Sequence, residues 1–542
     1  MTAAALLLLA AIVATEDASG ASLIHEGLAA LEAGRHEEAV HLLESAPGLA
    51  SSYDGLVGLA IARGHSGDLQ AAESGLAAAI RLDGRRPEAR IERGGLRFLQ
   101  KRYDEAVGDL RAALRYGDDA YARDLLASSL LLLDRPLEAI ESWNRLGQPR
   151  LERLTLHGLE HTRDATVRRE MRVREGERLD ADALRASLRS LDETGTFASI
   201  RVRADVPRER ALELALYLDE RHAFGEPIEL ASATFTNALV GRARLRYSNL
   251  GGRGIGIGAF YRWEGERPRL DGAVDWPRPF NLPVLMRVGA FRERQPYALD
   301  SGEPLTDRMR GVDVRFRRVL DGRHSADMTV RWRLRHYDQF HPSAFPGTLI
   351  GVEGSFERTF VEGARARVDA LARGFVAPDA FGVDAYYRSA LGGVRYRWRS
   401  APVGPPATQI VGRALWGLGS RRMPIDQMFA PGAAPDAEYP LRGHRLRENG
   451  VLGAAPIGRE LRLANLEWRQ ELWTRPLFGF GLTVFQDVAQ VRAVVSGSER
   501  VLFDLGAGIR IRLGQSPIIR IDYGHDLVGG ASTWTVVVGE PF

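Results

Sequence analysis

The chain of 542 residues contains no cysteine, which limits the kinds of site that it can carry. Without thiols there is no disulfide framework and no thiolate metal site. His36 and His41 stand five positions apart, so on a helix they face different directions and do not form a zinc-binding pair. No nucleophile elbow and no Ser-His-Asp arrangement stands out. We therefore predict a protein that is not an enzyme and that needs neither a metal nor a cofactor.

The sequence also lacks a long hydrophobic run and a large net charge. No stretch of ~18 apolar residues marks a membrane helix, so a membrane protein with this sequence would cross the bilayer with strands. The formal net charge of +3 is small for the length and gives no reason to expect a nucleic-acid partner.

The N-terminus predicts export. The stretch from Met1 to Val13 is apolar and is followed by small residues, which is typical of a secretory signal peptide, here over residues 1–21. An ordinary buried N-terminal helix is the alternative. The remaining length is too great for one core, so several domains are expected. We predict helical repeats over 22–149, a small α+β module over 150–225 and a β-barrel over 226–542.

The first of these regions repeats itself. Four helical segments align on Ala39, Ala72, Ala106 and Ala139, at spacings of 33, 34 and 33 residues. This period, with a small residue at the expected helix contact, resembles tetratricopeptide repeats. Such repeats stack into an all-α solenoid whose concave face binds an extended peptide or a partner domain. A simple spacer that holds the next domain at a distance is the alternative.

A different pattern begins at Leu151. A strand, two helices and two further strands follow one another as far as Glu220, with the phrases LHGLEHT, LRSLDETGTFASIRV and ELALYLDE. We expect the first helix over Ala165 to Arg174, with Asp164 as its N-cap. This order resembles a POTRA domain, the periplasmic module of the BamA/TamA superfamily of outer-membrane barrels. The resemblance implies an exposed strand edge that takes up an extended chain, with a rigid hinge as the alternative.

From Glu229 onward the sequence consists of strand-like segments and turns. Arg331, Arg333 and Arg335 share one face of a strand, and Trp332 and Leu334 take the other. Many such segments favour a transmembrane barrel with a wet interior and an apolar exterior. Counting a weak first strand near 229–238, we predict sixteen strands. The other fifteen are expected near 242–248, 255–264, 267–276, 283–293, 308–319, 325–337, 348–359, 363–374, 389–399, 407–418, 459–472, 477–487, 502–513, 517–524 and 533–542.

The longest irregular connection lies between Arg421 and Gly458, and connections of this length are usually functional. Its Leu441, Arg442, Gly443 and His444 resemble the loop-six signature of the superfamily, with His444 in the place of an aromatic residue. The resemblance implies that the loop folds back into the lumen and that Arg442 pairs with carboxylates of the wall. A guanidinium fork suits such a clamp. The partners that we expect around it are Glu467, Phe485 and Asp487.

Two expectations accompany this clamp. Gly443 should let the backbone turn sharply beside Arg442. Arg442 could also be only one more member of a charged lumen lining. At the end of the chain, Trp534 and the terminal Phe542 resemble the recognition signal of outer-membrane barrels.

The resemblance implies an outer-membrane protein whose repeats and POTRA-like module lie in the periplasm. Its function would be to insert or export polypeptides through the barrel. Its partners would be client polypeptides, outer-membrane lipids and a periplasmic protein on the repeats. Three alternatives stay open: a dedicated secretion translocator for one partner, a repeat-bearing porin, and a structural envelope anchor.

Overall fold

The computed structural model describes most of the 542 residues. The described residues are 19–147, 149–208, 211–222, 224, 234, 238, 241–298, 304–363, 365–378, 386–401, 407–475, 478–493, 499–513 and 518–538. The chain divides into two compact units. One comprises Met1–Thr155, Val173–Leu184 and Arg201–Tyr217, and the other comprises Leu156–Arg172, Arg185–Ile200 and Leu218–Phe542. The predicted signal peptide lies, up to residue 18, outside the described residues.

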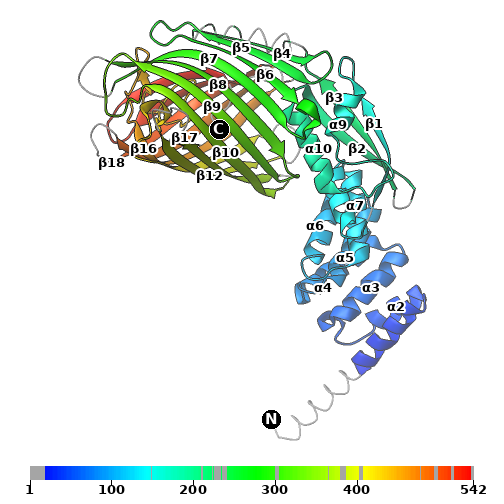
Figure 1. Ribbon diagram of the computed structural model, residues 1–542. Coiled ribbons are helices and arrows are strands. Elements are labelled where there is room, and N and C mark those ends of the chain that lie inside the picture. Colours follow the sequence, from blue (N-terminus) through cyan, green and yellow to red (C-terminus); the bar gives the residue numbers. More distant parts are fainter. Residues whose placement is uncertain are drawn as a thin grey trace, which may run out of the picture. The chain divides into compact units, whose positions relative to one another are not determined.

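The N-terminal region is an array of helices, as the repeat period predicts (Figure 1). Residues 19–32 are helical. The helices that follow are α2 (His36–Glu44), α3 (Tyr53–His65), α4 (Leu69–Leu82), α5 (Glu88–Leu99), α6 (Tyr103–Ala113), α7 (Ala120–Leu132) and α8 (Pro136–Asn144). None of the described helices combines the length and the hydropathy that crossing a membrane requires.

The repeat alignment corresponds to close packing between helices. The four alanines on which the segments align lie in α2, α4, α6 and α8, and each is buried. Small residues also allow the helices of a pair to approach. At Gly94 of α5, a Cβ atom would lie 2.8 Å from Cγ of Leu110 in α6. A period of about one helix pair therefore repeats the same contact, and the prediction of a tetratricopeptide-like solenoid is confirmed.

The small α+β module follows. Its elements are β1 (Arg150–His157), α9 (Asp164–Glu170), α10 (Ala181–Glu193), β2 (Phe197–Arg208) and β3 (Ala211–Glu220). The sheet order is β1-β3-β2, so β2 and β1 are its edges. Alternate residues of β3 are buried, as a strand with one covered face requires: Leu212, Leu214, Leu216 and Leu218.

The first helix of this module differs from the prediction. Helix α9 ends at Glu170 instead of Arg174, because Met171 is extended and the backbone N–H of Arg172 donates to the Ser187 hydroxyl at 2.8 Å. Asp164 is the first residue of the helix and not its N-cap. The N-cap is Arg163, whose side chain makes no capping hydrogen bond.

The remaining strands form one closed barrel (Figure 1). Within the described residues the sheet has seventeen strands, of which β14 (Arg447–Glu448) and β15 (Val451–Leu452) are two-residue strands of the long loop. The fifteen wall strands are β4 (Arg242–Leu250), β5 (Ile255–Arg262), β6 (Arg269–Pro277), β7 (Leu285–Tyr297), β8 (Leu305–Val319), β9 (His324–Tyr337), β10 (Gly347–Glu362), β11 (Ala366–Ala377), β12 (Tyr387–Arg399), β13 (Thr408–Gly419), β16 (Gly458–Thr474), β17 (Phe478–Ala493), β18 (Glu499–Leu513), β19 (Ile518–Asp526) and β20 (Ser532–Val538).

These fifteen strands coincide with the fifteen predicted ranges. The largest difference is at the end of β17, which reaches Ala493 instead of 487, and residues 539–542 of the last predicted strand lie outside the described residues. The weak strand expected near 229–238, which would make the sixteenth, lies outside the described residues except for Thr234 and Ala238. Consecutive wall strands pair in antiparallel register, and β13 pairs directly with β16 across the long loop. In the sheet order, β20 stands next to β4 and so closes the barrel.

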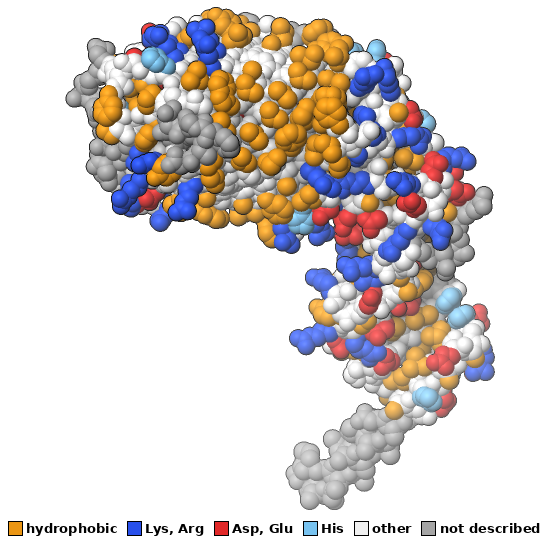
Figure 2. Space-filling view, viewed as in Figure 1, with side chains coloured by type: hydrophobic (Ala, Val, Ile, Leu, Met, Phe, Trp, Pro, Cys, Tyr) orange, Lys and Arg blue, Asp and Glu red, His pale blue; other side chains and the backbone are white. Residues whose placement is uncertain are grey.

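The two faces of the barrel wall have opposite polarity. On β9, Arg331, Arg333 and Arg335 turn inward and pair with Glu353, Asp313 and Asp426. Trp332 and Leu334 of the same strand are exposed on the outer face. Figure 2 shows hydrophobic side chains covering the side of the barrel that faces the viewer. This confirms the predicted alternation, which places the apolar side outward, as a barrel in lipid requires.

One part of the lumen is apolar, which the sequence did not predict. A cluster of buried residues joins the wall to the long loop. It includes Leu349 and Phe375 from the wall and Ile425, Phe429 and Leu441 from the loop. The loop therefore packs into the barrel with a hydrophobic core of its own.

Candidate functional site

The candidate site is built by the loop between β13 and β16. Besides β14 and β15 it contains the 3₁₀ helix η3 (Ile425–Gln427). The segment around Leu441 folds into the barrel, and Leu441 itself is fully buried. The Leu441 carbonyl accepts the N–H of His444 at 3.2 Å, which closes a tight turn. This turn presents Arg442 to the wall.

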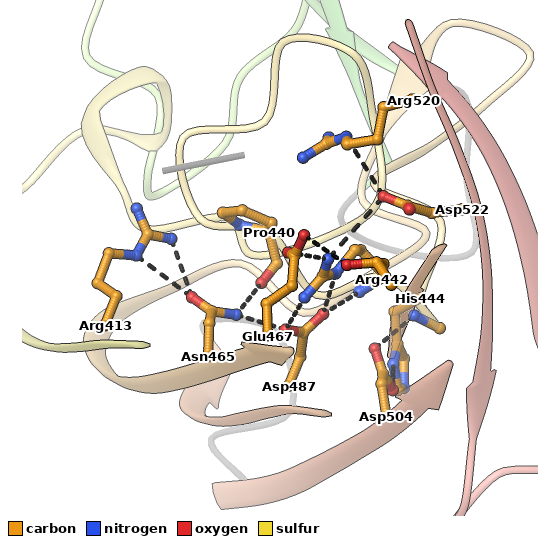
Figure 3. A network of polar contacts seen from close by, with 12 residues as sticks. Arg413, Pro440, Arg442, His444, Asn465, Glu467, Asp487, Asp504, Arg520 and Asp522 are labelled. Carbon is orange, nitrogen blue, oxygen red and sulfur yellow. Dashed lines mark hydrogen bonds and ion pairs between the residues drawn. The ribbon is translucent and has the colours of Figure 1, made fainter. Parts of the chain in front are cut away.

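Arg442 is only 2% exposed and is bound on several sides (Figure 3). Its Nε and Nη2 donate to the two carboxylate oxygens of Asp487 on β17, both at 2.8 Å. Its backbone N–H donates to the same carboxylate at 3.1 Å. Its Nη1 donates to Oε2 of Glu467 on β16 at 2.7 Å. Each of the three guanidinium nitrogens thus donates a hydrogen bond to a carboxylate, in a planar arrangement that a lysine ammonium could not reproduce.

The carboxylates around Arg442 have further partners. Oε1 of Glu467 accepts from Arg469 at 2.9 Å, from Arg510 at 2.8 Å and from the Thr483 hydroxyl at 3.1 Å. Arg510 in turn donates to Asp522 on β19 at 2.6 Å. Every buried charge named here has an opposite charge within hydrogen-bonding distance, as burial demands.

Phe485 supports the clamp from β17. Its ring centroid lies 3.5 Å from the guanidinium carbon of Arg442, and the ring is 1% exposed. A guanidinium over an aromatic face is attracted by the ring quadrupole, most strongly where water is excluded. The structure therefore brings Arg442, Glu467, Phe485 and Asp487 into one contact network.

Gly443 lies in the tight turn from Leu441 to His444, where the wall approaches the backbone closely. Its φ is not positive. A Cβ atom at this position would lie 2.6 Å from the Asp504 carboxylate carbon and 2.8 Å from the backbone nitrogen of Asp526. The Gly443 N–H donates to Asp504 at 2.5 Å, and its carbonyl accepts the Thr533 hydroxyl of β20 at 3.2 Å. The backbone does turn at Gly443, as expected, but without a positive φ, and glycine is required there because the wall leaves no room for a side chain.

His444 lies between two carboxylates. Its Nδ1 is 2.8 Å from Asp504 of β18, and its Nε2 is 3.1 Å from Asp526 at the end of β19. Two ring nitrogens that both face carboxylate oxygens fit the doubly protonated imidazolium, since both must donate. Burial alone would lower the pKa of His444, but the bonds and charges of Asp504 and Asp526 outweigh it and raise the pKa above its usual value.

These three residues also form the one described group with metal-binding geometry, with ligand atoms within 4.8 Å of one another. Both imidazole nitrogens are already directed at the carboxylates. The three side chains therefore satisfy one another's hydrogen-bonding groups without a metal ion.

The predicted terminal residues are only partly described. Trp534 on β20 points outward and is 70% exposed. Its ring centroid lies 4.9 Å from that of Tyr523 on β19. Phe542 lies outside the described residues.

Comparison with known proteins identifies one module of the chain and a similar fold. Residues 149–221 match the POTRA family, described as "Surface antigen variable number repeat". The solved structure of CdiB from Escherichia coli matches with a TM-score of 0.51 and 11% identity, over 71% of this chain and 75% of that chain. The chain thus combines a module of the POTRA family with a closed barrel, and its fold is like that of E. coli CdiB.

Other solved structures are similar at a lower TM-score. CdiB from Acinetobacter baumannii matches with a TM-score of 0.49 and 12% identity, over 79% of this chain and 80% of that chain. BamA from Haemophilus ducreyi lacking POTRA domains 1-3 matches with a TM-score of 0.43 and 13% identity, over 72% and 84%. No curated protein matches the chain. At these identities, the likeness to E. coli CdiB shows the fold alone.

Sequence reasoning missed several residues of the network, including an asparagine and three aspartates. Asn465 on β16 donates to Asp487 and to the Pro440 carbonyl, at 2.8 and 2.9 Å. Asp504, Asp522 and Asp526 are the others. A signal was present, because Asp522 and Asp526 share the inward parity of Arg520 on β19. The parity could show that they face the lumen, but not that the loop reaches them.

Proposed function

We propose that this protein is an outer-membrane factor that inserts polypeptides into the membrane, or exports them across it, through a BamA/TamA-type barrel. The observation that carries the proposal is the contact of Arg442 with Asp487 and Glu467 inside a barrel of this architecture. In a porin outside the superfamily, a loop arginine would not be expected to contact these two carboxylates.

The polarity of the barrel supports a location in the outer membrane. Large apolar side chains are exposed on the outer face of many strands, among them Trp332, Phe356, Trp416, Trp468 and Val484. Exposing this much apolar surface to water would be costly, whereas lipid accepts it. The backbone groups of a closed sheet are paired, so the wall can stand in the hydrocarbon layer. The POTRA module and the repeats would then lie in the periplasm.

The POTRA module offers a place for a client to bind. Strand β2 is an edge of the three-stranded sheet, and Arg201 and Arg203 on it are exposed. An edge strand presents N–H and C=O groups that can pair with an extended chain. Strand addition needs no nucleotide, and its energy comes from backbone hydrogen bonds. The helical repeats would hold a periplasmic partner or the client before this step.

Site-specific photocrosslinking tests the proposal in cells. A photoreactive amino acid replaces Arg201 on the edge strand, and the matched control carries it at Arg169, which is exposed on α9. Client capture at the edge predicts adducts with exported, not yet folded polypeptides at position 201 and few at position 169. Equal adducts at both positions, or none in actively exporting cells, would count against the proposal.

A further inference from the structure

A second cluster of charges holds the loop, and it is centred on Asp436. This carboxylate lies six positions before Arg442 in the same loop. One of its oxygens is 2.8 Å from Arg447 and 3.4 Å from Arg242, and the other is 2.9 Å from Arg267 and 3.6 Å from Arg262. One carboxylate thus gathers four guanidinium groups.

Three of these arginines lie in or next to the first described wall strands of the barrel. Arg242 begins β4, Arg262 ends β5, and Arg267 stands in the turn that leads to β6. All three are buried. Two other carboxylates lie in the cluster: Glu264 is bound by Arg267 and Glu293 by Arg262. Glu293 also pairs with Arg269, so five arginines share the carboxylates of Asp436, Glu264 and Glu293. Of these three carboxylates, Asp436 is the one that comes from the loop.

The charge of Asp436 is strongly favoured at this place. Its side chain is 27% exposed. Burial would raise the pKa of Asp436, but the neighbouring Arg447, Arg267 and Arg242 outweigh it and hold the pKa well below its usual value. Neutralising this carboxylate would leave the arginines to repel one another, which is costly in a partly dry site.

The two charged anchors of the loop differ in sign and in position. Arg442 is a cation that binds carboxylates of β16 and β17 and lies 3.9 Å from Asp522 of β19. Asp436 is an anion that binds arginines of β4 and β5. In the sheet order, β20 stands between β19 and β4. The anchors therefore lie on the two sides of the place where the last strand meets the first.

We propose that Asp436 is a second anchor of the loop, and that together with Arg442 it makes the loop a brace across the junction of β20 and β4. The Thr533 hydroxyl on β20 donates to the Gly443 carbonyl, so the last strand itself touches the brace. Asp436 is a positioning residue, since it acts by holding the segment that carries Arg442. The brace deepens the proposed function, because a polypeptide leaving the barrel sideways would have to pass this junction.

The test measures the position of the loop in the full-length protein inserted in lipid vesicles. Asp436→Asn keeps the shape of the side chain and removes its charge. Glu438→Gln is the matched control, because Glu438 is two residues away, is 58% exposed and its carboxylate pairs with Arg373. Since the chain has no cysteine, a spin label on a cysteine replacing the exposed Glu448 reports the motion of this loop alone.

Limited trypsin digestion gives a second readout. Arg445 is exposed in the same loop, and cleavage there requires the loop to open locally. We expect Asp436→Asn to raise the rate of this cleavage about tenfold or more, as loss of a charged hydrogen-bonded anchor predicts, and to mobilise the label at position 448. Glu438→Gln should change either quantity less than about twofold. Equal behaviour of the two variants would overturn the proposal.

A wall-side variant covers the case in which Asp436→Asn does not fold. Arg267→Gln removes one partner of Asp436. Arg269→Gln is its control, because Arg269 borders the same cluster through Glu293 but none of the described ion pairs joins it to Asp436. Faster cleavage in Arg267→Gln alone supports the anchor, and equal cleavage overturns it. Because these readouts follow the loop and not transport, a released loop with unchanged transport would support the anchor and count against the proposed function.

Discussion

Replacing Arg442 by glutamine should strongly destabilise the barrel. The substitution removes three side-chain hydrogen bonds, two to Asp487 and one to Glu467. Glu467 keeps Arg469 and Arg510, whereas Asp487 keeps only neutral donors among the hydrogen bonds described above, Asn465 and the backbone N–H of residue 442. Asp487 would thus remain fully buried without a charged partner.

The size of the effect follows from that orphaned charge. Removing one member of a buried ion pair costs about 3–5 kcal/mol. The loss of the contact between the guanidinium and Phe485 adds about 1 kcal/mol. Arg442→Lys should lie between Arg442→Gln and the wild type, because an ammonium keeps the charge but cannot bridge both carboxylates with the same geometry.

The assay is reversible urea unfolding in lipid vesicles, followed by the fluorescence of the tryptophans. Arg445→Gln is the control, since Arg445 lies three positions away in the same loop and is exposed. It should change the free energy of unfolding by less than about 0.5 kcal/mol. If Arg442→Gln costs no more than Arg445→Gln, then the buried clamp does not hold the folded barrel together.

Three further predictions follow. The pKa of His444 is raised on folding, so His444 should stabilise the protein below its unfolded pKa of ~6.5 and lose this effect as the pH rises through the folded value. The difference in unfolding free energy between the wild type and His444→Phe should therefore shrink as the pH rises, and a constant difference would exclude an imidazolium. Gly443→Ala should cost about 1–3 kcal/mol in the same urea assay, because its Cβ would meet Asp504 at 2.6 Å; an unchanged midpoint would show that the wall can yield. Gly94→Val should lower the helical signal in circular dichroism on heating before the barrel unfolds, because its Cβ would lie 2.8 Å from Leu110; an exposed substitution at Gly108, where a Cβ meets nothing within 4 Å, is the control.

The periodic patterns in the sequence predicted most of the fold. Two-residue alternation placed Arg331, Arg333 and Arg335 inward and the residues between them outward, and the repeat spacing placed Ala39 and Ala106 at helix contacts. These features are local, since each depends on the strand or helix that contains it. The end of α9 depended instead on a hydrogen bond from Arg172 to Ser187, which no local pattern reveals.

The site was predictable only in part. Arg442, Glu467 and Asp487 were predicted because the motifs that contain them resemble those of a known superfamily. Asp436 was not, because a single aspartate in a loop rich in proline and alanine has no pattern to mark it. Its role depends on Arg242, Arg262 and Arg267, which lie about 170 to 190 positions earlier in the sequence. Only the closure of the barrel brings these segments together.

The buried apolar cluster that joins the wall to the long loop could not be predicted either. Leu349 and Phe375 face inward near strand ends, where the alternation predicts polar side chains. They are buried because the loop supplies Ile425 and Phe429 as partners. The sequence pattern shows that these apolar residues face inward, but it does not show that the loop packs against them.

The most direct test of the proposed function is the rate at which an unfolded outer-membrane β-barrel inserts into lipid vesicles. A small barrel protein, diluted from urea, is added to vesicles that contain the full-length protein, the Arg442→Gln variant or no protein. Catalysed insertion predicts a rate clearly above that of empty vesicles with the wild type, and a loss of most of this increase with Arg442→Gln. Equal rates in all three preparations would contradict a role in inserting polypeptides.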